Sequence, residues 1–167
     1  MKHILVPVGS TENARNTLQY AIDLAQEIEA KVFVLRAYKV QTPAGTLKNV
    51  DEFLERESNL YMRTVINSVN TKEIDVQLIS AKGNVLDSIT SVDKELGVDL
   101  IVMGPKSNSI KEEVFLGSTS GSVLKQTDIP MLIVPDAYTF KPFTTVLTAV
   151  KSGVITTDNV LYPLQQL

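Results

Sequence analysis

The sequence predicts an α/β fold, a doubly wound open parallel sheet of five strands with helices on both faces. Five short runs rich in Val, Ile and Leu alternate along the chain with longer amphipathic stretches. Several of these runs are continuously apolar, which is typical of parallel strands that are buried on both faces. Strands joined through helices form right-handed crossovers, and these crossovers cover both faces of one sheet.

In the first half of the chain, strands are expected at residues 4–8, 32–37 and 74–80. Apolar residues recur at helical spacing over residues 13–29 and 50–70, which predicts a helix in each stretch. The residues that could cap the first of these helices are Ser10, Thr11 and Asn13. The apolar face of the second helix is expected to contain Val50, Phe53, Leu54, Tyr61 and Val65.

The second half of the pattern continues in the same alternation up to Asp136. A helix is expected at residues 85–96 and ends at Gly97, whose freedom to adopt a left-handed conformation suits a helix terminus. A strand at residues 99–103, a short helix at 118–125 and a strand at 131–134 follow. Periodicity alone does not give the order of the strands in the sheet.

After residue 136 the chain resembles its own beginning. Residues 137–143 read as a linker, and residues 4–10 align without a gap onto residues 146–152. We therefore interpret residues 144–167 as the start of a second, truncated repeat that opens with a strand at 145–150. Since a lone apolar strand cannot bury both of its faces, we expect it to pair with an exposed sheet edge.

Composition excludes several classes of function. The chain has 167 residues and a formal net charge of −3, so it lacks the basic field that binds nucleic acid or anionic lipid. The absence of Cys and the single His, His3, exclude thiolate zinc sites and most histidine-based metal sites. No apolar run is long enough for a membrane span or a signal peptide, and we expect a cytoplasmic protein.

No residue is predicted to be catalytic or to bind a metal. The sequence shows no nucleophile with a base, no metal-ligand cluster and no carboxylate pair, which argues against an enzyme. His3 is expected at the sheet end opposite the site, and Asp99 is expected to cap or solvate the start of a strand. Lys106 is best read as a solvated loop lysine, although it could offer a positive charge to a phosphate.

Two connections are candidates for binding, because ligands of open parallel sheets lie beyond the carboxyl ends of the strands. One is Pro7, Val8, Gly9 and the residues that follow them, and the other runs from Gly104 to a helix that starts near Ser118. Gly117, Ser118 and Thr119 combine small side chains, hydroxyls and free helix amides, which favour a phosphate. The alternative is that Ser118 or Thr119 only caps the helix.

Four segments together resemble the universal stress protein family: residues 4–8, 99–104, 117–118 and 129–134. The resemblance covers residues 1–136 in the right order. It implies a sheet in the order 3-2-1-4-5 and, for many members, dimers formed through the fifth strand. Tandem members are common in this family, so the chain looks like the N-terminal repeat of such a protein, a homodimer or a tandem pseudo-dimer.

The resemblance also implies a nucleotide site with two departures. Nucleotide-binding members carry Gly, two residues, Gly, nine residues and then Gly-Ser/Thr. Gly104, Gly117 and Ser118 match this pattern, but Ser107 replaces the middle glycine, and Gly9 stands where the family usually has Asp. If the middle position requires a positive φ, a residue other than glycine costs roughly 1–2 kcal/mol there. We therefore expect binding of ATP with Mg²⁺ to be weakened or absent.

An occupied site would hold the phosphates and the base at different strand ends. The residues expected to contact the nucleotide are Pro7, Val8, Gly9, Ala37, Gly104, Ser107, Gly117, Ser118 and Thr119. The base is expected near Val8, Gly9 and Ala37, and a divalent ion is expected to be held mainly by the phosphates. The resemblance thus implies a non-catalytic stress-response module that binds an adenine nucleotide. The alternatives are a dimerisation module with a vestigial pocket and a weak ATP hydrolase.

Overall fold

Five parallel strands form one sheet in the part of the chain that the computed structural model describes, residues 1–9, 13–39, 50–105, 118–147, 149 and 162–165. The order is β3-β2-β1-β4-β5, as the resemblance implied, and every neighbouring pair is parallel. The strands are β1 (His3–Pro7), β2 (Lys31–Tyr38), β3 (Val76–Lys82), β4 (Leu100–Met103) and β5 (Met131–Ile133).

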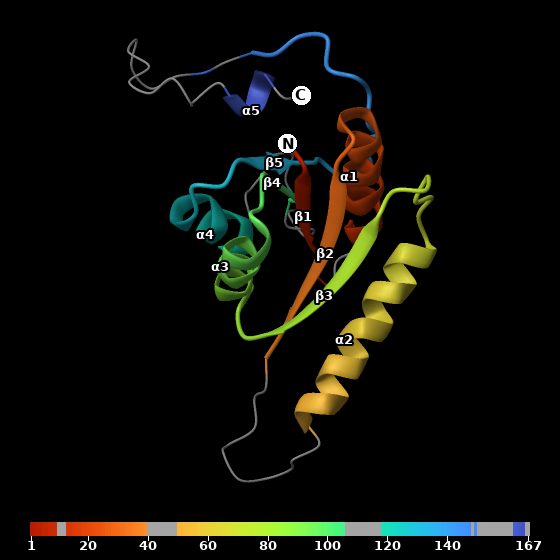
Figure 1. Cartoon of the computed structure of the whole chain (residues 1–167), viewed down its shortest axis with the longest axis vertical. Helices are drawn as coiled ribbons and strands as arrows, with labels where there is room; N and C mark the ends of the chain where they lie inside the picture. Colours follow the sequence, from red (N-terminus) through yellow and green to blue (C-terminus); the bar gives the residue numbers. More distant parts are fainter. Residues whose placement is uncertain (10–12, 40–49, 106–117, 148, 150–161, 166–167) are drawn as a thin grey trace.

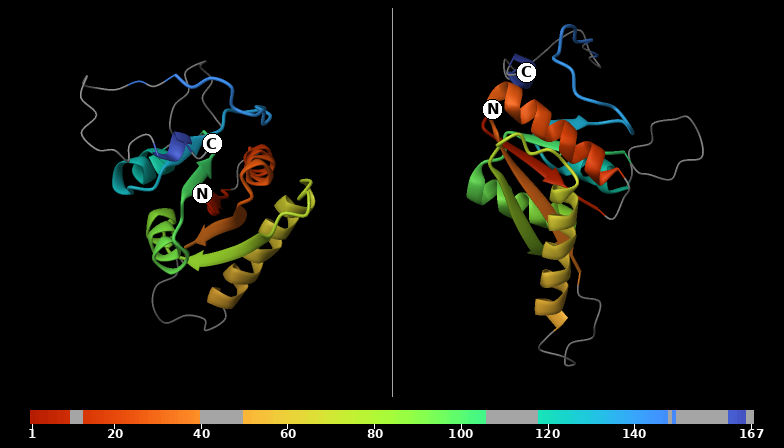
Figure 2. Two further views of the ribbon diagram at one scale, coloured as in Figure 1. Left: turned by 45° about the horizontal axis from the view of Figure 1, so that its top comes forward. Right: turned by 90° about the vertical axis from the view of Figure 1, so that its right-hand side faces the viewer.

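Helices cover both faces of this sheet, which confirms the predicted fold class (Figures 1 and 2). The helices are α1 (Ala14–Ile28), α2 (Val50–Asn67), α3 (Val85–Leu96), α4 (Ser118–Gln126) and the short α5 (Tyr162–Gln165). Up to residue 136 every predicted element is present, with ends that differ by no more than three residues. No described helix combines the length and the apolar character that crossing a membrane requires.

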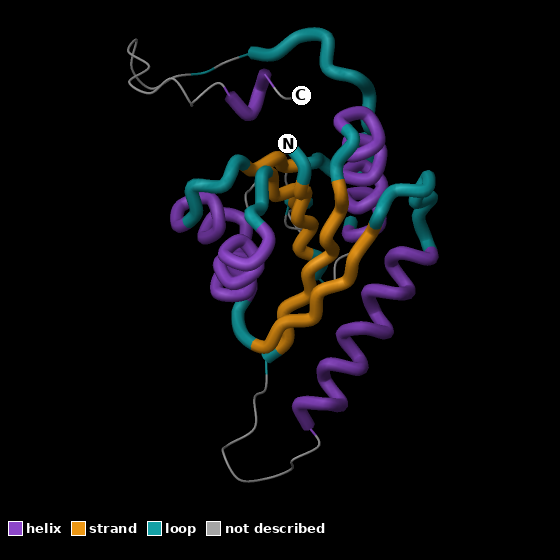
Figure 3. The backbone as a smooth tube through the Cα atoms, in the orientation of Figure 1, coloured by secondary structure: helices purple, strands orange, loops and turns teal. Residues whose placement is uncertain are grey.

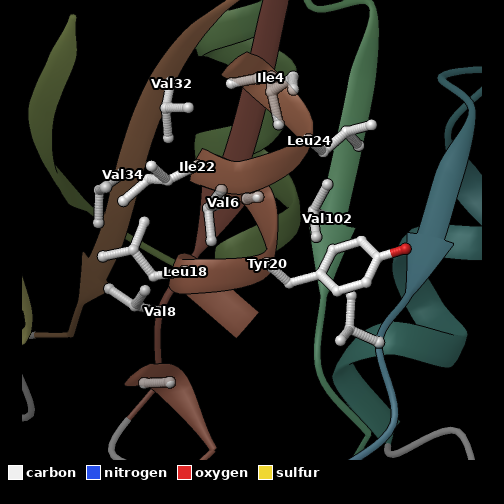
Figure 4. Close-up of a cluster of buried hydrophobic side chains, with 14 of the residues drawn as sticks. Ile4, Val6, Val8, Leu18, Tyr20, Ile22, Leu24, Val32, Val34 and Val102 are labelled. Carbon is white, nitrogen blue, oxygen red and sulfur yellow. The ribbon is translucent and has the colours of Figure 1, made fainter. Parts of the chain in front are cut away.

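The two faces of the sheet carry two separate cores, built from alternate residues of the same strands. Ile4, Val6 and Val34 point toward α1 and α2, as Figure 4 shows for the α1 side. Leu5 and Leu35 point the other way and pack with side chains of α3 and α4. Because both faces are covered, the central strands are apolar at successive positions, which explains the continuous runs in the sequence.

The predicted apolar face of α2 is wrong at Phe53, whereas Val50 and Leu54 on the same face are half-buried. The residues of α2 that are buried are Ser58, Met62 and Val65, whereas Phe53 is 60% exposed. Figures 1 and 2 show the first turns of α2 extending beyond the ends of β2 and β3. The sheet therefore offers no surface for Phe53 to pack against, and only the later turns of the helix contact the core.

The segment after β5 is packed against α1, although its sequence reads as a linker. The ring of Phe140 meets the ring of Tyr20 edge to face at 5.4 Å, and Phe140 joins the core on that side of the sheet. Tyr138 also packs against Tyr20, and burial, together with Tyr138, raises the pKa of Tyr20. Residues 137–143 are thus fixed to the domain by aromatic contacts.

The strand expected at residues 145–150 does not form within the described residues. Residues 145–147 and 149 have no regular secondary structure, and residues 148 and 150 lie outside the described part. Figure 3 draws the segment that leads up to residue 147 as loop. Leu147 is 95% exposed, so no described strand or helix covers it. An isolated strand has no partner for its backbone groups, which is the physical reason that the repeat pattern alone does not produce one here. The assignment of 144–167 to a second repeat stays a prediction.

At the amino edge of the sheet, Asp99 and His3 connect β1 to the end of α3. The Asp99 carboxylate accepts hydrogen bonds from the backbone N–H groups of Lys2 (2.6 Å) and His3 (3.0 Å). The His3 ring Nδ1 lies 2.8 Å from the carbonyl oxygen of Leu96. Both residues are therefore structural and lie at the sheet end opposite the candidate site, as predicted.

At the opposite edge, β4 ends against the first turn of α1. A Cβ atom added to Gly104 would lie 2.8 Å from both Asn13 Nδ2 and Thr17 Oγ1. Asn13 occupies the N-cap position, but its side chain makes no capping hydrogen bond. The Asn13 Nδ2 and Thr17 Oγ1 atoms are buried without hydrogen-bond partners in the described part of the chain. Close approach of α1 thus requires glycine at position 104.

The Asp99 contact predicts a pH-dependent contribution to stability. Partial burial by itself would raise the pKa of Asp99, but the two backbone hydrogen bonds and the nearby N-terminus and His3 lower it. A lowered pKa in the folded state means stabilisation that is present above the ordinary Asp range and is lost as the pH falls through the folded pKa. Asp99→Asn should lower the free energy of unfolding by about 1 kcal/mol at pH 7.

Urea unfolding between pH 3 and pH 7 measures this effect. The curves of the wild type and of Asp99→Asn should converge at the acidic end, where the wild-type carboxyl is protonated. The control is Asp128→Asn, which changes another exposed aspartate at the same edge. Its free energy of unfolding should follow that of the wild type at every pH. A difference between the wild type and Asp99→Asn that is constant over this pH range would contradict the role of the charge.

Two glycine-to-alanine substitutions should have opposite effects on stability. Gly104→Ala forces the stiff, β-branched Thr17 away, and overpacking of this kind costs about 1–3 kcal/mol. Gly121 lies inside α4 with no atom within 4 Å of an added Cβ, so Gly121→Ala should gain up to about 1 kcal/mol from helix propensity. Equal shifts of the urea midpoint for the two variants would show that the contact with α1 is not tight.

Candidate functional site

The carboxyl ends of all five strands meet at one edge of the sheet, the lower edge in Figure 1. Pro7 ends β1, and Val8 and Gly9 follow it, with the Val8 N–H donating to the Leu35 carbonyl of β2 (2.8 Å). Ala37 is the second-to-last residue of β2, and Gly104 follows β4 directly. The fold therefore brings the predicted residues of three strand ends to the same edge.

The turn from β3 into α3 adds a wall at this edge. Gly83 has a φ of +132°, which side chains with a Cβ rarely adopt, and its N–H donates to the Tyr38 carbonyl (2.9 Å). Asn84 caps α3, and its side chain accepts a hydrogen bond from the Asp87 N–H (2.9 Å). The N–H groups of Val85 and Leu86, in the first turn, have no acceptor within the helix.

A cavity of about 490 Å³ lies between these elements, and we call it the edge cavity. It is bounded by the end of β2, the β3–α3 turn and one side of α4. Its lining residues are Ala37, Lys39, Gly83, Asn84, Val85, Leu86, Thr119, Ser122 and Gln126. The amino ends of two helices, α3 and α4, thus border the same space, and helix amino ends favour anions.

The beginning of α4 is the better of the two helix ends for a phosphate. The first turn of α4 contains no acidic residue, whereas Asp87 places a carboxylate in the first turn of α3. Thr119 is exposed and Ser122 lies three residues later, so both hydroxyls line the edge cavity from one side of α4. Lys39, which directly follows β2 and is also exposed, adds a cation to the lining of the edge cavity.

On the α2 side of the sheet edge, the charges near the end of β2 are either paired or acidic. Burial, followed by the carboxylates of Glu55 and Asp51, raises the pKa of Tyr38. Asp51 forms an ion pair with Lys82 at the end of β3. A phosphate is therefore favoured on the α4 side of the edge over the α2 side.

Among the predicted site residues, Ala37 and Thr119 line the edge cavity, while Pro7, Gly9 and Gly104 lie at the same sheet edge outside its lining. Val8 is a core residue: its side chain is 6% exposed and its N–H is already paired, so it offers a ligand little. Ser118 starts α4. Ser107, Lys106 and Gly117 lie outside the described residues.

Most of the residues that line the edge cavity were missed by sequence reasoning. The β3–α3 turn has the sequence of an ordinary turn and helix cap. Its residues Gly83, Asn84, Val85 and Leu86 become part of the site only because β3 lies beside β2. The available signal was the position of this turn: it too follows the carboxyl end of a strand. Within the described residues, no group of three or more His, Asp or Glu is arranged to hold a metal ion.

Comparison with known proteins places this fold in a family. The model of the universal stress protein family matches residues 1–135. The chain is 25% identical over 138 residues to universal stress protein MJ0531 of Methanocaldococcus jannaschii, and this match covers 80% of the chain and 81% of the relative.

Two solved structures that share the fold are complexes with a nucleotide. A universal stress protein in complex with cAMP superposes with a TM-score of 0.63 at 18% identity, covering 80% of this chain and 96% of its own. The universal stress protein from Archaeoglobus fulgidus in complex with dAMP superposes with a TM-score of 0.56 at 17% identity. This match covers 80% of this chain and 97% of the Archaeoglobus chain. The match of the family model to four fifths of the sequence, together with the fold, leads to one conclusion: the chain belongs to the universal stress protein family.

Proposed function

We propose that this protein is a stress-response module that binds an adenine nucleotide in the edge cavity and acts by binding, without turnover. One observation carries the proposal: the amino ends of α3 and α4 border a single cavity of about 490 Å³ at the carboxyl edge of the sheet. The polar residues Asn84, Thr119 and Ser122 line this cavity together with Ala37. Such a mixture of apolar and polar walls suits a base at one end and a phosphate at the other.

The phosphate is assigned to the start of α4 and the base to the region of Ala37. The free N–H groups in the first turn of α4 and the hydroxyls of Thr119 and Ser122 are donors for phosphate oxygens, and Lys39 places a positive charge in the same cavity. Complexes of family members with cAMP and dAMP support an adenine nucleotide as the ligand class. The described lining contains no carboxylate, so we expect Mg²⁺ to enter bound to the phosphates of a ligand such as ATP.

A negative charge at the start of α4 should weaken nucleotide binding without lowering the stability of the fold. Thr119→Glu places a carboxylate where we expect the phosphate, and it should weaken binding of cAMP, AMP or ATP by at least about tenfold. The same charge is favourable at a helix amino end, so the thermal stability should be maintained or increased. Isothermal titration calorimetry of each nucleotide, beside a thermal melt, measures both quantities.

Thr64→Glu, which makes the same substitution at an exposed position in the second half of α2, is the matched control and should bind like the wild type. If the wild type gives no heat with any adenine nucleotide at millimolar concentration, the proposal is wrong and a dimerisation module with an empty pocket takes its place. Release of inorganic phosphate from ATP above the buffer rate, lost in Thr119→Glu, would contradict binding without turnover.

A further inference from the structure

A tyrosine on α2 is hydrogen bonded to the backbone at the end of β1. The Tyr61 hydroxyl donates to the Gly9 carbonyl oxygen at 2.6 Å, a contact between residues 52 positions apart in the sequence. Gly9 is exposed and lies two residues beyond the end of β1, at the carboxyl edge. Since glycine has more backbone freedom than any other residue, a bond to its carbonyl restricts a segment that would otherwise sample many conformations.

The Tyr61 ring is itself held by a cation. The Arg36 guanidinium carbon lies 3.8 Å from the ring centroid, a distance at which a cation and an aromatic face attract. Arg36 belongs to β2 and precedes Ala37, which lines the edge cavity. The sheet, α2 and the end of β1 are thus connected through three residues in series: Arg36, Tyr61 and Gly9.

Among the described residues, no hydrogen bond or ion pair offers another explanation for the position of Arg36. Its Nη1 atom is buried and makes no hydrogen bond, and no carboxylate forms an ion pair with it in the described part of the chain. Two further hydroxyls are buried without partners among the described residues: that of Ser80, which pairs with Arg36 in the register of β2 and β3, and that of Ser58, one turn before Tyr61 on α2. Burying polar groups without partners costs stability. A feature that costs stability and holds a backbone at a site edge is best explained by the geometry that it maintains.

We propose that Tyr61 and Arg36 are positioning residues. They fix Gly9, which is outside the lining of the edge cavity but lies beside Ala37 in the register of β1 and β2, so that the end of β1 is preformed for a nucleotide that extends past Ala37. This inference rests on the proposed function for its ligand. A backbone that is already ordered does not lose that conformational freedom when the ligand binds, so affinity increases without a new contact to the ligand.

Tyr61→Phe tests the role because it removes the hydroxyl and keeps the ring under Arg36. Nucleotide affinity should fall by roughly two- to tenfold, the size of one net hydrogen bond, while the thermal melting temperature changes little. Amide hydrogen exchange at Gly9, followed by NMR in the protein without nucleotide, should accelerate. Arg36→Met keeps an apolar stem but removes the cation, and it should change affinity and exchange in the same direction without lowering stability.

Tyr138→Phe is the matched control: it also removes one tyrosine hydroxyl, from a ring that packs on Tyr20, and it should alter neither affinity nor exchange at Gly9. If exchange at Gly9 is unchanged in Tyr61→Phe, or if this variant binds nucleotide like the wild type, the inference is overturned. If the wild type binds no nucleotide while exchange at Gly9 accelerates in Tyr61→Phe, the proposed function has failed and the restraint itself remains. The two failures are therefore distinguishable.

Discussion

Burial of β1 and β4 on both faces is the constraint on which the rest of the structure depends. Ile4 and Val6 of β1 belong to one core, and Leu5 between them belongs to the other. A strand with two apolar faces needs a helix layer on each side, and every helix that returns the chain to a parallel strand starts from the same sheet edge. The carboxyl edge therefore collects every strand end and the starts of α3 and α4, which is why the candidate site lies there.

The same constraint explains which parts of the fold could be predicted from the sequence. Buried strands leave continuous apolar runs, and α1 and α3 leave clear helical periodicity, so these elements were found nearly to the residue. Phe53 was misjudged because periodicity does not reveal that the first turns of α2 extend beyond the ends of β2 and β3 (Figure 1), and Phe53 is 60% exposed. The packing of Tyr138 and Phe140 on Tyr20 was missed because it joins segments far apart in the sequence.

The candidate site was predicted less completely than the fold, for a related reason. Helix amino ends and small residues such as Thr119 can be recognised locally, since their chemistry follows from their own sequence neighbourhood. The β3–α3 turn enters the site only through the lateral order of the strands, which came from the family resemblance and not from periodicity. Tyr61 could not be predicted to contact Gly9, because the orientation of α2 across the sheet decides which of its side chains reaches that carbonyl.

Gly104 shows how a residue that matches a binding motif can have a different physical role. The family pattern suggests that this glycine allows a phosphate to approach, yet the space beside its Cα is occupied by Asn13 and Thr17 of α1. The edge cavity lies on the other face of the sheet, since Ala37 follows Leu35 on the side of α3 and α4. Glycine at this position is therefore required by packing whether or not a nucleotide binds. A match at Gly104 alone indicates the fold, and the argument for a ligand depends on the cavity and the helix ends that border it.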